Sequence, residues 1–165
     1  MAVSAYEVIS TQTLGSAAAS VTFSSIPQTY TDLVLICFAN YATGAAVGSI
    51  QLQFNGDTAS NYSWIYMSGS GSSATSGVGN NASVAVGGSG GSSSGGYFGT
   101  GITEIYNYSN TTTYKSVLAR ADADNGAQAW CSMWRNTNAI SSILIYGPYS
   151  FASNSTFTLY GIKAA

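Results

Sequence analysis

Charged side chains are so scarce in this sequence that they limit the secondary structure it can form. Of the 165 residues, 6 are acidic, 4 are basic and none is histidine, so only 6% are charged. An ordinary soluble domain has about 25%. Exposed helix faces are normally built from Glu, Lys and Arg, and no sustained apolar repeat of helical period is present. The sequence therefore predicts a chain built almost without helices.

Strand patterns recur roughly every 10 to 15 residues and are separated by turn residues. Because no helical crossover separates them, we expect an antiparallel, all-β sandwich of jelly-roll type. The whole chain, residues 1–165, is predicted to form a single domain. The expected strands are Tyr6–Thr13, Ala19–Phe23, Asp32–Phe38, Ser49–Phe54, Tyr62–Met67, Ile102–Tyr106, Tyr114–Ala121, Ala127–Trp134, Ser142–Tyr146 and Ser155–Lys163.

Some of these strands carry stronger signals than the others. Asp32–Phe38 is an almost uninterrupted apolar run, which predicts a central strand covered on both faces. Ser49–Phe54 alternates apolar and polar residues, which predicts one buried face. Asn55-Gly56 should form a turn directly after it, because both residues tolerate positive φ. Gly147-Pro148 should end the strand before it, since proline cannot donate a ladder hydrogen bond.

Residues 68–101 differ in composition from the rest of the chain. Glycine and serine dominate this segment, and no charge occurs between Asp57 and Glu104. Such a composition is typical of a flexible linker or long loop. Neither flank alone supplies enough strands for a closed sandwich, so we interpret the segment as a loop inserted in one domain. Ser83–Val86 could form a short strand within it.

The two cysteines, Cys37 and Cys131, lie far apart inside apolar segments. The first residues lack the basic and apolar regions of a signal peptide. The longest apolar run, Leu33–Ala39, is far shorter than the about 20 residues of a membrane-spanning helix. We therefore expect a chain made in the cytoplasm and not secreted. Both cysteines are expected to be reduced and buried rather than joined in a disulfide.

The composition also excludes several classes of function. Without histidine, Ser-His-Asp triads, Cys-His pairs and histidine metal sites cannot form. Four basic residues are too few for a nucleic-acid-binding surface, and a net charge of −2 argues against anionic membranes. We expect neither nucleic acid nor a membrane as a partner.

The carboxylates offer little chemistry. Asp122 and Asp124 are close in sequence, but the residues after them lack the Gly and Glu of an EF-hand loop. A polar hairpin turn on Asn125-Gly126 is the simpler interpretation. Asp57 could pair with another carboxylate for glycoside hydrolysis only if the fold brought one near. The glycine-rich tract lacks the Lys-Ser/Thr of a phosphate-binding loop. We expect no enzyme, no metal site and no cofactor.

The aromatic residues allow two interpretations. Trp64, Trp130 and Trp134 could stack sugars in a glycan-binding site, but a tryptophan in a strand is more often part of a core or an interface. Tyr106 and Tyr108 would share one strand face and are candidates for an exposed aromatic pair. The residues expected to contact another subunit or a capsid are Tyr106, Tyr108, Tyr114 and Arg135.

Four segments together carry a resemblance to a known family. They are Phe23-Ser24-Ser25-Ile26-Pro27-Gln28-Thr29-Tyr30-Thr31-Asp32-Leu33, Phe54-Asn55-Gly56-Asp57, Asn61-Tyr62-Ser63-Trp64 and Phe157-Thr158-Leu159-Tyr160-Gly161-Ile162-Lys163. In this order they resemble a family of small structural proteins of tailed bacteriophages, common in marine and cyanobacterial phages. The resemblance spans most of the chain and is weakest over 68–101. It implies a jelly-roll fold and attachment to a virion.

The resemblance and the composition together favour a role in assembly. A surface with little charge repels copies of itself weakly. We expect a capsid decoration (cement) protein that forms a homotrimer over junctions between major capsid subunits and stabilises the head. The alternative is a tail-fibre or head-fibre adhesin module that binds host-surface glycan. A glycan-cleaving enzyme is disfavoured, because carboxylates are sparse. In either favoured case the protein would be located in the virion.

Overall fold

The structure, a computed structural model, describes residues 6–44, 48–92, 96–123 and 126–163. These ranges contain twelve strands and no helix. The expected all-β sandwich is therefore confirmed. The strands are β1 (Tyr6–Thr13), β2 (Ala18–Phe23), β3 (Asp32–Ala39), β4 (Gly48–Phe54), β5 (Tyr62–Gly69), β6 (Ala74–Ala82), β7 (Ala85–Gly90), β8 (Gly99–Tyr106), β9 (Lys115–Ala123), β10 (Gly126–Trp134), β11 (Ile143–Phe151) and β12 (Thr156–Ile162).

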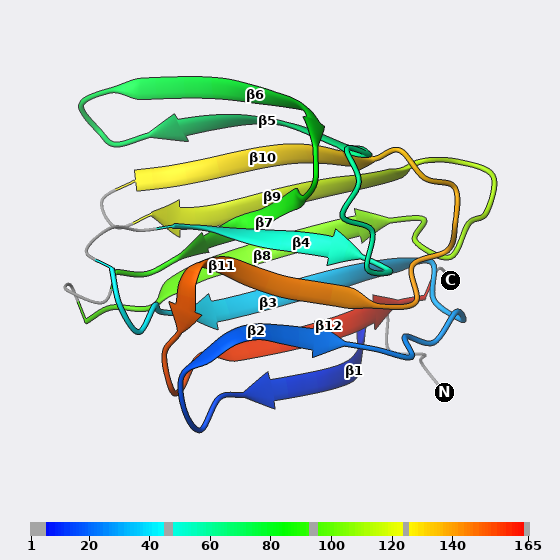
Figure 1. The fold of residues 1–165 in the computed structure, drawn as a ribbon, viewed down its shortest axis with the longest axis horizontal. Helices are drawn as coiled ribbons and strands as arrows, with labels where there is room; N and C mark the ends of the chain where they lie inside the picture. Colours follow the sequence, from blue (N-terminus) through cyan, green and yellow to red (C-terminus); the bar gives the residue numbers. More distant parts are fainter. Residues whose placement is uncertain (1–5, 45–47, 93–95, 124–125, 164–165) are drawn as a thin grey trace.

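The strands are divided unequally between two sheets (Figure 1). The larger sheet has eight strands in the order β1-β12-β3-β8-β9-β10-β5-β6, and the smaller has four in the order β2-β11-β4-β7. Eight of the strands pair in a nested way, β1 with β12, β2 with β11, β3 with β8 and β4 with β7. The hairpins β5–β6 and β9–β10 lie outside this set and widen the larger sheet only.

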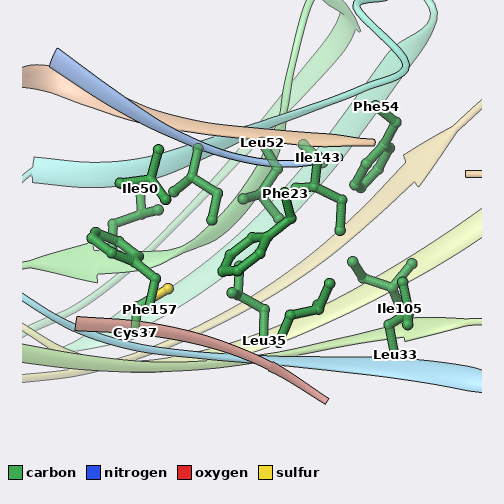
Figure 2. Packing of buried hydrophobic residues seen from close by; sticks show 14 of the residues in the cluster. Phe23, Leu33, Leu35, Cys37, Ile50, Leu52, Phe54, Ile105, Ile143 and Phe157 are labelled. Atoms are coloured by element: carbon green, nitrogen blue, oxygen red, sulfur yellow. The ribbon is translucent and has the colours of Figure 1, made fainter. Parts of the chain in front are cut away.

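The main hydrophobic core lies between the two sheets. Figure 2 shows Leu33, Leu35 and Cys37 of β3 pointing toward Ile50 and Leu52 of β4, and all five side chains are fully buried. These residues stand at alternate positions of their strands, because successive side chains of a strand point to opposite faces of the sheet. The predicted alternation of Ser49–Phe54 thus correctly identified the buried face of β4.

The prediction that β3 is covered on both faces is only partly correct. β3 is an inner strand, between β12 and β8, and its outward-facing Val34 is buried. However, Phe38 on the same outer face is 48% exposed. It stacks on Phe98 at a ring-centroid distance of 4.9 Å, and no further sheet of the described residues packs over it. The outward-facing Val34, Ile36 and Phe38 are all apolar, but of these three only Val34 is buried.

The expectation of a long flexible loop over residues 68–101 is wrong. The segment contains β6, β7 and the start of β8, and all six residues of β7 are buried. The backbones of the two sheets approach closely here. A Cβ atom added at Gly101 would lie 3.2 Å from the carbonyl oxygen of Gly87, and one added at Gly99 would lie 2.9 Å from the nitrogen of Gly91. Glycine is needed at these close approaches because side chains would not fit.

Several local predictions were correct in part. Asn55 and Gly56 form the expected turn, with φ of 55° and 69°. The following β5 belongs to the larger sheet, so this turn does not close a hairpin with β4. Pro148 does not end β11, because it lies in the irregular stretch between Tyr146 and Phe151, where the pairing of β11 with β2 is interrupted before it resumes at Phe151. The strands on either side of the Asn125-Gly126 turn pair as predicted, although residues 124 and 125 lie outside the described residues.

The cysteines differ from each other. Both are free thiols, as expected, and Cys37 is buried in the core. The prediction that Cys131 is also buried is wrong, since its side chain is exposed. Trp130, its neighbour on β10, faces the inside of the sandwich and therefore turns Cys131 outward.

Candidate interaction surface

The outer face of the larger sheet carries many exposed apolar side chains. Met67, Val78 and Ile65 are 68%, 63% and 55% exposed, and Met133 and Leu118 are 40% and 37% exposed. An antiparallel sheet with one face in the core is normally polar on the other face. We call the group on β5, β6, β8, β9 and β10 the outer apolar face. Its residues are Ile65, Met67, Val78, Tyr106, Leu118, Cys131 and Met133.

Strand register brings these side chains together. Ile65 of β5 lies opposite both Val78 of β6 and Cys131 of β10, and Cys131 lies opposite Leu118 of β9. Residues directly opposite each other share a face, so these four form one continuous row across four strands. With Met133 they line a shallow hollow of ≈ 440 Å³. The row is contiguous, which distinguishes it from isolated exposed apolar residues.

A second hollow continues the same face toward the opposite end of the strands. Its volume is ≈ 750 Å³, and Met67, Ile102 and Ala129 supply much of its apolar lining. Arg120 and Asp122 of β9 also line it and place charge on its β9 side. The two hollows thus follow one another along β5 and β10.

Charge is confined to one side of the outer apolar face. Arg120 is 3.5 Å from Glu104, and this pair lies on β8 and β9. The hydroxyl of Tyr106 donates a 2.8 Å hydrogen bond to Glu104, which raises the pKa of that tyrosine. Strands β5, β6 and β10 contain no charged residue. Covering this part of the face would therefore remove no charge from water, a step that is otherwise costly.

Of the four predicted contact residues, the structure places one on the outer apolar face. Tyr106 is 39% exposed and lines the smaller hollow. Tyr114 is 53% exposed but precedes β9 and lines neither hollow. The guanidinium of Arg135 donates hydrogen bonds to the Ser60 carbonyl at 2.8 Å and to Asn81 Oδ1 at 3.1 Å. Arg135 thus ties the ends of β5 and β6 to the end of β10.

The prediction that Tyr108 is exposed beside Tyr106 is wrong. Tyr108 is fully buried, and its hydroxyl donates a hydrogen bond to the carbonyl of Pro27. β8 ends at Tyr106, and Asn107 then takes a positive φ of 53°. The alternation of a strand does not continue through such a turn, so Tyr108 points into the core.

Asp57, the carboxylate considered for catalysis, acts as a hydrogen-bond acceptor within the fold. It accepts bonds from Asn61 Nδ2 at 2.9 Å, Trp134 Nε1 at 2.8 Å and the Ala59 backbone nitrogen at 3.0 Å. Partial burial raises its pKa, but the bonds from Asn61, Trp134 and Ala59 outweigh this effect and hold the pKa below its usual range. In the described ranges, no three His, Cys, Asp or Glu side chains converge as a metal site would require.

Apart from Tyr106, the residues of the outer apolar face were not identified from the sequence, although a signal was present. Trp64, Ile65, Tyr66 and Met67 are four successive large apolar residues in one strand. Alternation sends two of them to each face, so the run predicts a strand that is apolar on both sides. Val78 gave no such signal, because it lies alone in a segment of glycine, serine and asparagine.

The fold and this surface define an all-β sandwich whose larger sheet presents an uncovered apolar face. No family model, curated protein or solved structure matches the chain. Among the residues with assigned positions, no helix is long and apolar enough to cross a membrane. Any function must therefore be argued from the surface itself.

Proposed function

We propose that this protein is a bacteriophage virion structural protein, a capsid decoration protein that assembles through its outer apolar face. The observation that carries the proposal is the row Leu118–Cys131–Ile65–Val78, which is apolar, contiguous and exposed. Covering such a row stabilises an assembly by about 25 cal/mol per Å² of apolar area removed from water. In this role the protein would act mechanically, as a homotrimer that bridges major capsid subunits, and would not be an enzyme.

The edge of the larger sheet supports the same proposal. β6 is an edge strand, and it contains neither charged residues nor proline. Edge strands of monomeric proteins are usually protected by such residues, because unpaired backbone groups otherwise invite another chain. An unprotected edge beside the outer apolar face is expected if β6 lies against a neighbouring subunit.

The strand order supports the jelly-roll assignment that accompanies this proposal. In a jelly roll, a long hairpin of strands is wound into two sheets, so that early strands pair with late ones in a nested order. The pairs β1–β12, β2–β11, β3–β8 and β4–β7 follow this order. The two added hairpins then belong to the surface that is proposed to assemble.

Cys131 allows a direct test of assembly. We expect its thiol to react with a maleimide when the protein is dilute. The thiol should be protected when the protein is concentrated, and also after the protein has been added to capsids prepared without it. Buried Cys37 should stay unreactive throughout and serves as the internal control. Equal reactivity of Cys131 in all three states would contradict the proposal.

A charge placed on the outer apolar face should weaken assembly. Leu118→Lys is expected to reduce association with itself and with capsids by about tenfold or more, because the ammonium would lose its water. Thr22→Lys is the matched control, since it adds the same charge to an exposed position of β2 in the other sheet. Sedimentation and capsid co-pelleting measure both. If Leu118→Lys assembled as well as the control, the outer apolar face would not be the contact surface.

A further inference from the structure

The β5–β6 hairpin has a second face that the smaller sheet covers only in part. Figure 1 shows β5 and β6 extending beyond β7, which is the edge strand of the smaller sheet on that side. Residues at alternate positions of β5 point to this side, opposite to Ile65 and Met67. They are Trp64 and Tyr66, and both are only half-buried.

The aromatic rings on this side form a connected group. Tyr66 stacks on Trp130 of β10 with ring centroids 4.5 Å apart and an interplanar angle of 26°. Trp64 meets Trp130 edge to face at 5.5 Å. Trp130 is 7% exposed and also contacts Val86 of β7. The buried Trp130 thus holds two half-buried rings in fixed positions.

Two glycines of β6 determine how these rings lie. Gly77 is the cross-strand partner of Tyr66, and Gly79 is that of Trp64. A Cβ atom at Gly77 would lie 2.5 Å from Tyr66 Cε1, and one at Gly79 would lie 2.3 Å from Trp64 Cε2. Both rings therefore lie across the β6 backbone, where no side chain stands in their way. The two ring centroids lie 6.2 Å apart and the ring planes are tilted by 45°, so the rings form an angled aromatic platform.

A fixed amide borders the platform. Gln128 Oε1 accepts hydrogen bonds from Ser89 Oγ at 2.8 Å and from Trp130 Nε1 at 3.2 Å. These two donors fix the orientation of the amide. Its NH₂ group donates no hydrogen bond within the described residues. Ser68 lies directly opposite Gln128 and adds a hydroxyl on the same side.

The platform lacks charge. No residue of β5, β6, β7 or β10 is charged. Single-stranded nucleic acid also stacks on aromatic rings, but it requires basic residues along its phosphates. A sugar ring combines an apolar face of C–H groups with a rim of hydroxyls, which suits aromatic rings beside an amide and a hydroxyl.

We infer that this platform, made of Trp64 and Tyr66 with Gln128 and Ser68 at its border, binds a neutral saccharide. A sugar ring would lie on Trp64 and Tyr66, and its hydroxyls would accept from the Gln128 amide and exchange hydrogen bonds with Ser68. The platform lies on the opposite side of β5 from the outer apolar face. Saccharide binding and assembly can therefore be tested separately.

Electrophoresis of the full chain through gels that contain a soluble polysaccharide tests the inference. We expect at least one of dextran, mixed-linkage β-glucan and galactomannan to retard the protein and to reduce quenching of its tryptophan fluorescence by acrylamide. Trp64 is the tryptophan that reports this change, because Trp130 and Trp134 are buried. Retardation by none of these polymers, or only by polygalacturonate or oligo-dT, would overturn the inference.

Variants of the platform sharpen the test. Trp64→Ala should weaken retardation by about tenfold. Gln128→Glu keeps the acceptor for Ser89 and Trp130 but removes the amide donor, and it should weaken retardation even if Trp64→Ala does not fold. Val8→Ala removes an exposed apolar side chain from β1, at the opposite edge of the larger sheet. It belongs to neither proposed surface, is the matched control and should bind like the unaltered protein. Unchanged retardation of both platform variants would also overturn the inference.

Discussion

At the scale of single residues, Asp57 connects a turn to the core. One carboxylate oxygen accepts from the Ala59 backbone, and the other accepts from both Asn61 and the buried Trp134. A buried indole N–H that loses its acceptor is expensive, because water does not replace the bond. Asp57 is therefore expected to stabilise the fold rather than to take part in chemistry.

Asp57→Asn should destabilise the protein by about 1–3 kcal/mol at pH 7, because the new NH₂ group must face an N–H donor. The pKa of Asp57 is lowered in the folded state. Its contribution is therefore complete above the pKa of an unfolded aspartate, about 4, and is lost as the pH falls through the lower folded value. Urea unfolding at several pH values should show the difference between the two proteins shrinking in acid. A constant difference would contradict this linkage.

Lys115 is a charged residue that the structure buries. Alternation in β9 puts it on the same face as Val117, and the structure buries it completely. Its ammonium donates to the carbonyls of Thr113 at 2.7 Å and Thr137 at 3.1 Å, and burial lowers its pKa. Thr113 precedes β9 and Thr137 follows β10, so the two carbonyls meet at Lys115 only because β9 and β10 pair.

At the scale of elements, β5 is informative because its two faces are both apolar and both partly uncovered. Ile65 and Met67 belong to the outer apolar face, whereas Trp64 and Tyr66 form the aromatic platform. A one-residue change of register would exchange the two sets. Tyr62, at the start of the strand, is fully buried and its hydroxyl donates to the Asp57 carbonyl, which fixes the register.

The glycine-rich tract allows a prediction about β7 and β8. Gly99→Ala should destabilise the protein by about 1–3 kcal/mol, because the new methyl group would meet backbone atoms that cannot rotate away. Gly15→Ala is the control, since nothing lies within 4 Å of a Cβ atom there and its φ is not positive. Thermal unfolding measures both. Equal unfolding midpoints for the two variants would mean that the close approach of the sheets at Gly99 does not exclude a side chain.

At the scale of the whole molecule, the two added hairpins decide what is exposed. The nested strands form two layers, but β5, β6, β9 and β10 all extend the larger sheet. Four strands of the smaller sheet cannot cover eight. The same imbalance therefore leaves the platform uncovered on one side and widens the outer apolar face on the other.

The scarcity of charge leads to a prediction about salt. In the described part of the chain, the ion pairs are Arg120–Glu104 and Lys163–Glu7, and both are partly exposed. Exposed pairs contribute about 1 kcal/mol or less. We expect stability and self-association to change little between roughly 0.01 M and 0.5 M NaCl, although screening differs greatly across this range. Dissociation at high salt, seen in sedimentation, would mean that charges and not apolar groups hold the assembly.

The sequence by itself determined the fold class and most strand positions, because alternation and turn residues are local properties. Ile50, Leu52 and Phe54 could be assigned to the core, and the turn at Asn55 could be predicted, from neighbouring residues alone. Pairing partners could not, since β1 meets β12 across most of the chain. The formation of β7 within the expected loop, the burial of Tyr108 and the exposure of Cys131 depend on how the two sheets pack against each other. Only tertiary structure decides that, because it sets where side chains have room and which faces lack cover.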